Sequence, residues 1–281
     1  MPPANEPPTD LPTTLRTYLA VCPQGGQVVR HDGHWVVRTP ANPSWFWGNF
    51  LQFDAPPSAA DALRWPALFT HHVGAPGHVA LGWETDEAGD AGVMAAFRAM
   101  GYEPLENLVM VADAVSPAPP PDIHATLRPL ASESDWQALV EFNVATRDAA
   151  FSEAGYRRYS DARVAQWRRQ CESGLGSWVG AFVAGELAST LGLFAESRPG
   201  ADGLRLARYQ EVTTAVKWRR RGLCSALLPF AAAQLERLAV HRHVIVADEH
   251  DLARHIYAAR GFNVQARWRG LLLADASAGA A

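Results

Sequence analysis

Three consecutive arginines, Arg219, Arg220 and Arg221, stand directly before Gly222 and a run of helix-forming residues. The first turn of a helix leaves backbone N–H groups without intrahelical partners, and the helix dipole adds about half a positive charge there. A glycine lets a ligand approach the main chain closely, and flanking guanidinium groups add charge-assisted donors. This combination is typical of a phosphate-binding turn. An exposed basic loop that binds nothing is the alternative that the tripeptide alone leaves open.

The segment around this turn, QEVTTAVKWRRRGLCSALL, resembles motif A of the GCN5-related N-acetyltransferases, the GNAT family, whose pattern is Q/R-x-x-G-x-G/A. Arg219 occupies the first position of that pattern and Gly222 the second, whereas Cys224 stands where glycine or alanine is usual. Pro229 follows within the same expected helix, where it removes a backbone hydrogen bond and predicts a kink.

A second segment, ADEHDLARHIYAARGF at positions 247–262, resembles motif B of the same family, in which the helix after the fifth strand ends in a Tyr-x3-Gly-Phe pattern. Tyr257, Gly261 and Phe262 match this pattern, and His250 stands where the family often has asparagine. An amphipathic helix with Tyr257 on its buried stripe is the purely structural alternative. The presence of both segments in the family's order favours the functional interpretation.

The resemblance covers about residues 122–273 and implies an acetyl-CoA site between the fourth and fifth strands, which diverge in this family. Main-chain groups of two residues on the fourth strand would pair with the pantetheine arm like an added strand. The amides of the arginine turn would hold the pyrophosphate, with the arginine side chains reinforcing them. The cofactor-binding residues that the resemblance implies are Val212, Thr214, Arg219, Arg220, Arg221, Gly222, Leu223, Cys224, Ser225 and His250.

The chemistry that the resemblance implies is direct attack of an amine on the thioester carbonyl. Tyr257, at the matching family position, would protonate the leaving thiolate, whose thiol has a pKa of about 8.5. An amine with a lysine-like pKa of about 10.4 is almost fully protonated at pH 7, so a general base is required. Glu211, on the strand beside the expected thioester, is the candidate base; the alternative is an outward-facing Glu211 paired with Arg208. Asp248 and Glu249 are weaker candidates.

The histidine pairs of the sequence do not predict a metal site. His241 and His243, like His71 and His72, have no third ligand nearby in the sequence, so surface positions are expected and no metal is predicted. The sequence also contains no G-x-S-x-G nucleophile elbow and no Walker loop.

The residues that carry these motifs alternate between strand and helix patterns. The expected elements are a strand over 123–130, a helix capped by Ser134 with Gln137, a helix over about 161–172, a hairpin over 177–194 with its turn at 184–185, a strand over 204–214, a helix over 222–238, a strand over 243–247, a helix over 251–260 closed by Gly261, and final strands over 263–273. This order predicts an α/β (α+β) fold with a mixed, mostly antiparallel twisted sheet flanked by helices.

The preceding residues are less regular, with strands expected over 27–38, 45–53, 79–84 and 105–113 and a helix over 91–100. The aromatic run NPSWFWGNF, at 42–50, predicts a strand packed into the core, with some rings available to wall a substrate pocket. AMGYEP (99–104) and AARGFN (258–263) both follow a helix and precede a strand, which indicates two tandem GNAT-like halves. The first lacks any counterpart of RRRGLC and is therefore expected to be degenerate.

The proline-rich run SPAPPPD, which begins at Ser116, separates the two halves and predicts a stiff, extended linker. The resulting division is a disordered lead-in (1–14), a degenerate GNAT-like domain (15–115), a linker (116–121) and an acetyl-CoA-binding GNAT domain (122–281). We call residues 1–121 the front half and residues 122–281 the back half.

Charge and composition limit the function classes. The 281 residues are 48% hydrophobic and 19% charged, and their net charge of −4 argues against a nucleic-acid partner. The front half holds 5 basic and 12 acidic side chains, and the back half holds 20 and 17, so the back half is the better host for an anion. Cys22, Cys171 and Cys224 are too scattered for a disulfide framework. With no signal peptide and no long apolar stretch visible, we expect a cytoplasmic protein without a membrane partner.

The sequence thus predicts an acyltransferase that moves an acetyl group from acetyl-CoA to an amine of a small molecule, with a cationic acceptor slightly favoured. The alternative is a non-catalytic acyl-CoA-binding sensor or regulatory module. A monomer or a homodimer is expected.

Overall fold

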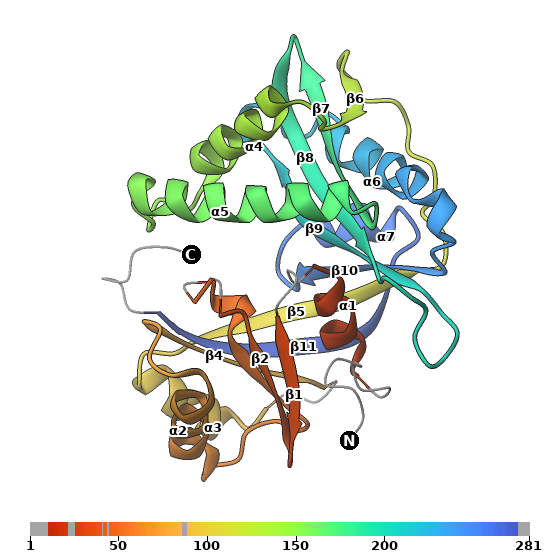
Figure 1. Cartoon of the computed structure of the whole chain (residues 1–281). Helices are drawn as coiled ribbons and strands as arrows, with labels where there is room; N and C mark the ends of the chain where they lie inside the picture. Colours follow the sequence, from red (N-terminus) through yellow and green to blue (C-terminus); the bar gives the residue numbers. More distant parts are fainter. Residues whose placement is uncertain (1–10, 22–25, 41, 44, 86–88, 275–281) are drawn as a thin grey trace.

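The computed structural model describes residues 11–21, 26–40, 42–43, 45–85 and 89–274. Within this part of the chain, eleven strands form one continuous sheet in the order β1-β2-β3-β4-β11-β5-β10-β9-β8-β7-β6 (Figure 1). The strands are β1 (Gln27–His31), β2 (His34–Arg38), β3 (Phe50–Phe53), β4 (His78–Glu84), β5 (Glu103–Ala112), β6 (Thr126–Pro129), β7 (Gly176–Val183), β8 (Glu186–Ala195), β9 (Leu206–Thr214), β10 (Arg242–Asp248) and β11 (Asn263–Ala274). The β3–β4 and β9–β10 pairs are parallel and the other neighbours antiparallel, which confirms the predicted fold class.

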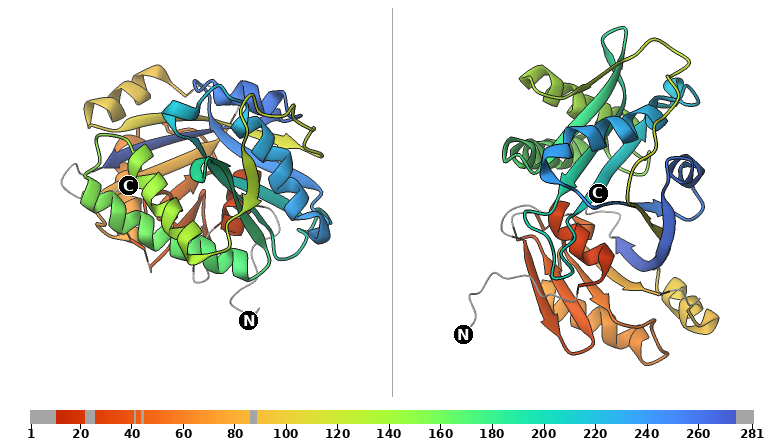
Figure 2. Two further views of the ribbon diagram at one scale, coloured as in Figure 1. Left: turned by 90° about the horizontal axis from the view of Figure 1, so that it is seen from above. Right: turned by 90° about the vertical axis from the view of Figure 1, so that its right-hand side faces the viewer.

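Helices flank both ends of this sheet, as Figure 2 shows from two further sides. They are α1 (Thr13–Val21), α2 (Asp61–Val73), α3 (Ala91–Ala99), α4 (Glu133–Thr146), α5 (Glu153–Glu172), α6 (Leu223–Gln234) and α7 (Ala253–Ala258), with short 3-10 turns at Phe46–Gly48, Val216–Trp218 and Glu236–Leu238. Within the described residues, none of the helices combines the length and apolarity that a bilayer-spanning segment needs.

Successive residues of β7 are buried on opposite faces of the sheet, because neighbouring side chains of a strand point to opposite sides. Trp178 stacks on Trp167 of α5 with ring centroids 4.1 Å apart. Val179, the next residue, belongs instead to the core cluster that contains Leu227 and Leu228 of α6. The helices α5 and α6 therefore cover opposite faces of the back-half strands.

The two halves share their central strands. β11, the last strand of the back half, lies between β4 and β5 of the front half, and β5 lies between β11 and β10. The order β1-β2-β3-α2-β4-α3-β5 recurs as β7-β8-β9-α6-β10-α7-β11. Gly101 after α3 and Gly261 after α7 have φ values of 90° and 94°, so the repeated sequence motif marks the same left-handed turn.

Several predicted boundaries were wrong. The N-cap of α4 is Ser132, not Ser134, because Ser132 and Asp135 form the capping box reciprocally. α5 begins at Glu153, well before the expected start at residue 161. The expected strand over 45–53 is a 3-10 turn followed by β3. The strand expected over 27–38 is a hairpin of β1 and β2, and the strands expected over 263–273 are the single strand β11. The other expected elements are present with shifted ends.

Two helices of the front half were not predicted. α1 begins at Thr13, inside the expected lead-in, of which residues 1–10 lie outside the described part. α2 contains Pro66, and a proline inside a helix removes a backbone hydrogen bond. Burial of Trp65 and Phe69, at 2% and 0% exposure, overrides that penalty.

The proline-rich linker packs along the back half and contacts the arginine turn. The Ser116 main chain donates to the carbonyl of Arg260 (2.9 Å), and the Asp122 main chain donates to that of Arg221 (3.1 Å). The linker therefore supports the turn that the sequence analysis singled out for phosphate.

Candidate active site

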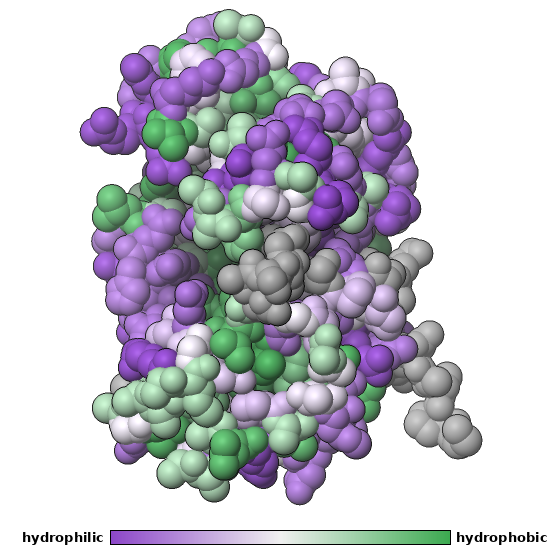
Figure 3. Space-filling view, turned by 90° about the vertical axis from the view of Figure 1, so that its left-hand side faces the viewer, coloured by the Kyte–Doolittle hydropathy of each residue, from purple (hydrophilic) through white to green (hydrophobic). Residues whose placement is uncertain are grey.

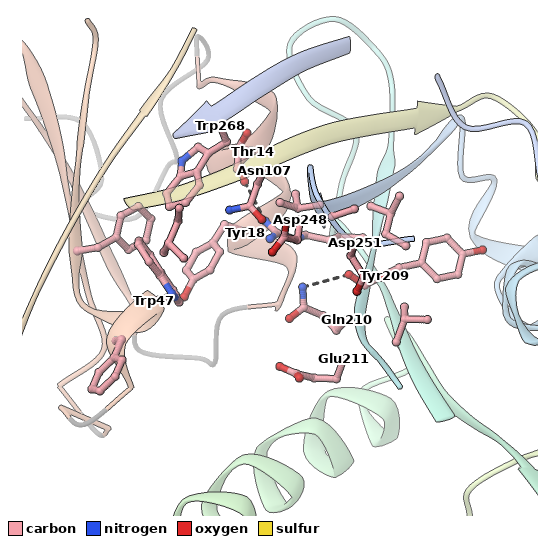
Figure 4. Close-up of a pocket in the computed structure, with 18 of the residues that line it drawn as sticks. Thr14, Tyr18, Trp47, Asn107, Tyr209, Gln210, Glu211, Asp248, Asp251 and Trp268 are labelled. Atoms are coloured by element: carbon pink, nitrogen blue, oxygen red, sulfur yellow. Dashed lines mark hydrogen bonds between the residues drawn. The ribbon is translucent and has the colours of Figure 1, made fainter. Parts of the chain in front are cut away.

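A cavity opens where β9 and β10 diverge. These parallel strands pair at only three positions, the last of which joins Arg208 to Val244. Beyond this point β9 continues to Thr214 and β10 to Asp248, both fully described, without pairing to each other. A cavity of about 620 Å³ lies against the separated segments and extends to the front half (Figure 4). From the side shown in Figure 3, hydrophobic residues lie in a recess between the two parts of the molecule.

A β-bulge redirects β9 at this point. Thr190 of β8 pairs with Thr213 and Gly192 with Gln210, so that Glu211 and Val212 together oppose one residue of β8. Glu211 adopts a φ of 48°, a left-handed conformation that costs a non-glycine residue about 1–2 kcal/mol. Backbone strain of this kind concentrates at functional sites.

The bulge places Glu211 on the cavity wall (Figure 4). Burial, and then the nearby charge of Glu211, raises the pKa of the Tyr156 hydroxyl on α5. The Arg208 guanidinium, expected as a possible partner of Glu211 on the outer face, donates to the carbonyl of Thr14 (3.2 Å) and lies 5.5 Å from the Tyr18 ring centroid. Glu211 thus faces the space in which a general base would be needed.

Tyr257 of α7 lines the same cavity and is 5% exposed. Burial raises the pKa of its hydroxyl far above the ordinary value, and Cys224 and Asp251 raise it further. Burial likewise raises the pKa of the Cys224 thiol to about 12. Both groups therefore carry their protons at neutral pH. A thiolate that forms in this cleft would meet the same desolvation, so its own pKa would rise as well.

The arginine turn has a left-handed backbone at two positions, and its glycine packs closely against the linker. Gly222 is the N-cap of α6 with a φ of 78°, and Arg220 has a φ of 62°. A Cβ atom on Gly222 would stand 3.3 Å from Cα of Pro121. The Ala226 amide makes a helical bond to the Gly222 carbonyl (3.0 Å), and the amides of residues 223–225 form the first turn, which has no earlier helical carbonyls to meet.

This turn borders a second hollow of about 390 Å³, whose lining is mostly basic. Its lining residues are Asp122, Val216, Lys217, Arg219, Arg220 and Arg221. The three arginines are exposed and form no salt bridge with a carboxylate of the described residues. The Arg219 Nε atom donates to the Thr214 carbonyl (3.2 Å), which connects the hollow to the end of β9. The charge of this surface suits a phosphate group.

The other predicted site residues lie in different surroundings. Val212 lines the cavity, Leu223 is buried in the core, and Ser225 is half-buried in the first turn of α6. The His250 ring is 2.9 Å from a carboxylate oxygen of Glu106, and His250 is not among the residues that line the cavity.

The acidic groups near motif B divide between ion pairs and the cavity. Glu249 is bound to Arg269 at 2.9 Å and to Arg267 at 3.4 Å, so its carboxylate is occupied. Asp248 and Asp251 line the cavity. The Asp248 carboxylate accepts the His250 amide (2.7 Å), and that of Asp251 accepts the Ala253 amide (2.9 Å).

The front half supplies an aromatic wall that the sequence analysis only partly anticipated. The lining residues from this half are Thr14, Leu15, Tyr18, Trp45, Phe46, Trp47, Phe50, Gln52, Leu105 and Asn107. Some rings of the aromatic run 42–50 were predicted to wall a pocket. Tyr18, Gln52 and Asn107 were not predicted as lining residues. Tyr18 stacks on Trp45 with centroids 5.6 Å apart. The amphipathic pattern of the helix that carries Tyr18 is the signal that would have found it.

Buried residues of the back half were missed too. Trp268 of β11 lies in the wall and donates from Nε1 to Oε1 of Gln52 (3.2 Å), across the junction of the two halves. Arg163 of α5 is 1% exposed and lies over the Trp45 ring, 3.7 Å from its centroid. No local sequence pattern marks either residue, because strand exchange and helix packing bring them to the cavity.

Comparison with known proteins agrees with this geometry at the level of fold. No family model matches the chain, and no curated protein matches its sequence. A functionally unknown conserved protein from Staphylococcus epidermidis ATCC 12228 is 14% identical with a TM-score of 0.66, over 88% of this chain and 94% of that one. A GCN5-related N-acetyltransferase from Kribbella flavida is 16% identical with a TM-score of 0.59, over 92% and 91%. Another, from Sphaerobacter thermophilus, is 16% identical with a TM-score of 0.53, over 86% and 81%.

These similarities establish that the chain has the fold of the GCN5-related N-acetyltransferases, as the two sequence motifs predicted. Identities of 14–16% bear on the fold and not on the substrate.

Proposed function

We propose that the protein is an N-acetyltransferase that transfers an acetyl group from acetyl-CoA to an amine of a small molecule. One observation carries the proposal: β9 and β10 separate immediately beyond Arg208 and Val244, and the gap contains Glu211 and Tyr257 and leads toward the arginine turn. A bound acetyl-CoA would supply an activated thioester at this gap.

The residues present fit the shape of coenzyme A. The main chain of β9 at Val212 and Thr214 has no strand partner on the β10 side, so an extended amide-containing chain could pair with it. The amides of Leu223, Cys224 and Ser225 and the guanidinium groups of the turn would hold a pyrophosphate. Cys224 is small enough to leave this approach open.

The two candidate catalytic groups have complementary tasks. The Tyr257 hydroxyl keeps its proton at neutral pH and donates it to the sulfur atom as the carbon–sulfur bond breaks. Glu211 removes a proton from the acceptor's ammonium group, directly or through a water molecule, and the resulting neutral amine attacks the thioester carbonyl. As the amide forms, the nitrogen loses a second proton, which restores the Tyr257 hydroxyl, and the thiol leaves with the proton that Tyr257 donated.

The cavity favours a small, cationic acceptor. Its volume of about 620 Å³ falls within the usual range for small-molecule pockets. The lining holds three carboxylates, those of Glu211, Asp248 and Asp251, and two guanidinium groups, those of Arg163 and Arg208. The excess of negative charge favours a cation, and the rings of Tyr18 and Trp47 offer cation–π contacts. The acidic groups come from the back half, so the acidity of the front half is not what favours a cation here.

A second function, a non-catalytic acyl-CoA-binding sensor, is favoured by one observation. The pKa of Tyr257 is raised so far that its hydroxyl would be a weak acid toward an unperturbed thiolate. A sensor would use the same phosphate turn without turnover.

Incubation with acetyl-CoA and a panel of small amines, with free thiol as the readout, distinguishes the two. The transferase predicts amine-dependent thiol release. Binding of acetyl-CoA without thiol release for any amine class would contradict the transferase and support the sensor.

A further inference from the structure

Three histidines from two elements of the front half meet outside the active-site cavity. His31 ends β1 and His34 begins β2, on either side of a tight turn, and His72 lies in the last turn of α2. None of the three lines the cavity. In the sequence His72 stands beside His71 with no third ligand nearby, whereas the fold brings His31 and His34 to it.

The spacing of these imidazoles matches a metal coordination shell. The Nε2 atoms of His34 and His72 are 3.4 Å apart, and one ring nitrogen from each of the three histidines lies within 4.8 Å of the others. Two nitrogens bound to a tetrahedral zinc ion at about 2.0–2.1 Å stand about 3.3–3.4 Å from each other. The His34–His72 pair already has this separation.

An outer contact orients the buried member of the cluster. The Nδ1 atom of His34 is 3.1 Å from the Asp32 carbonyl, which can only accept a hydrogen bond. Nδ1 therefore carries the proton, and Nε2 presents its lone pair to the cluster. The Phe53 ring, with its centroid 5.5 Å from that of His34, packs against this imidazole. Such a fixed tautomer and ring orientation are typical of metal-binding histidines.

Fixed charges close to the cluster bear on the binding of a cation. The carboxyl end of α2, which points here, carries partial negative charge. The nearby guanidinium of Arg30 is neutralised by Asp54 at 2.6 Å.

We propose that His31, His34 and His72 bind one divalent transition-metal ion, zinc being the best match, with water as the fourth ligand. Imidazole is a preferred ligand of zinc, and three protein ligands with an open fourth position form a recognised zinc arrangement. His31 and His72 are half-buried, so an ion can enter from solvent. The ion would tie the β1–β2 turn to the end of α2. The proposal does not rest on the proposed acetyl transfer.

The test uses the full chain without an affinity tag, stripped of metal with a chelator. Titration with Co²⁺ should produce the visible absorption of a tetrahedral site with an endpoint at one ion per chain, and Zn²⁺ should abolish it. Zinc should also raise the thermal midpoint. X-ray absorption at the zinc edge should report three imidazole nitrogens and one oxygen, and this measurement needs no variant.

Two variants and one matched control complete the test. His31→Ala and His72→Ala should each weaken metal binding by more than the roughly 10- to 100-fold that loss of an outer contact costs. His71→Ala removes the adjacent, exposed imidazole and should leave binding unchanged. The proposal is overturned if the wild-type protein does not bind cobalt or zinc at one ion per chain. It is also overturned if His31→Ala and His72→Ala bind the metal as tightly as the wild type does.

Discussion

Arg208 of β9 and Val244 of β10 form the last paired position between these parallel strands, and the sheet opens beyond them. Buried main-chain N–H and C=O groups nearly always find partners, so an opened strand pair within a continuous sheet indicates a place for a ligand that supplies them. The bulge at Glu211 and the buried Tyr257 both face this opening. The chemistry that we propose follows from this one interruption.

Replacement of Tyr257 by phenylalanine tests the proton donor. The ring stays buried against Phe262, whereas the hydroxyl is lost, so the fold and coenzyme A binding should be preserved. The rate of acetyl transfer should fall by about 10²- to 10⁴-fold. Steady-state thiol release and calorimetric binding of coenzyme A measure the two quantities separately. Unchanged turnover would remove Tyr257 from the mechanism.

The Glu211→Gln substitution tests the general base. Since glutamine keeps the size of the side chain but cannot accept a proton, kcat should fall by about 10²- to 10⁴-fold at pH 7. The kcat of the variant should rise toward alkaline pH, because the acceptor amine is then already neutral and needs no general base. Glu236→Gln, at an exposed carboxylate of a 3-10 turn, is the matched control and should be neutral. If Asp248→Asn has the larger effect, Asp248 is the base instead.

Sequence patterns predicted local structure where consecutive residues build it. The arginine turn is a local structure, because its glycine, its arginines and the first turn of α6 are consecutive, so its position and backbone geometry could be predicted. The hairpin turn at Ala184 and Gly185 and the left-handed Gly261 were likewise readable from local chemistry.

Features that depend on distant contacts could not be predicted. The position of Trp268 beside Gln52 results from strand exchange between residues 216 positions apart. The cluster of His34 with His72 joins residues 38 positions apart. α2 was missed because the burial of Trp65 outweighs the cost of Pro66 only in the folded chain.

The Asp135 carboxylate should stabilise the fold in a pH-dependent way. It accepts hydrogen bonds from Arg128 (2.6 Å) and from the amides of Ala131 and Ser132, and these hold its pKa far below the usual value. A group whose pKa is depressed on folding contributes stability above its unfolded pKa of about 3.9, and this contribution is lost as the pH falls. Asp135→Ala should therefore lower the free energy of unfolding by about 2–3 kcal/mol at pH 7.

The difference in the free energy of unfolding between the Asp135→Ala variant and the wild type should shrink below about pH 4. The stabilising contribution of the ionised Asp135 carboxylate is lost as the pH falls further. Urea unfolding across this pH range measures it. Asp161→Ala, at an exposed carboxylate of α5, is the control. A difference that stays constant from pH 7 to the acid limit would contradict the assigned role.

The shared central strands predict that neither half folds alone. Residues 122–281 would lose β5, which pairs with both β10 and β11, and residues 1–121 would lose β11 from between β4 and β5. Both pieces would expose unpaired strand edges that promote aggregation. Size-exclusion chromatography and circular dichroism should show misfolded or aggregated pieces when each is made separately, and a folded complex when both are made together. A folded, monomeric 122–281 piece would be inconsistent with this dependence.

Calorimetric titration with coenzyme A measures whether the opening between β9 and β10 and the arginine turn bind this ligand. We expect one molecule bound per chain, and binding weakened about tenfold by Arg220→Ala, because the variant loses about 1.4 kcal/mol from one charge-assisted contact. Arg198→Ala, in the exposed loop at the opposite end of β9, should bind like the wild type. Absence of binding at millimolar coenzyme A, or equal affinity in the Arg220 and Arg198 variants, would show that the arginine turn does not hold the pyrophosphate.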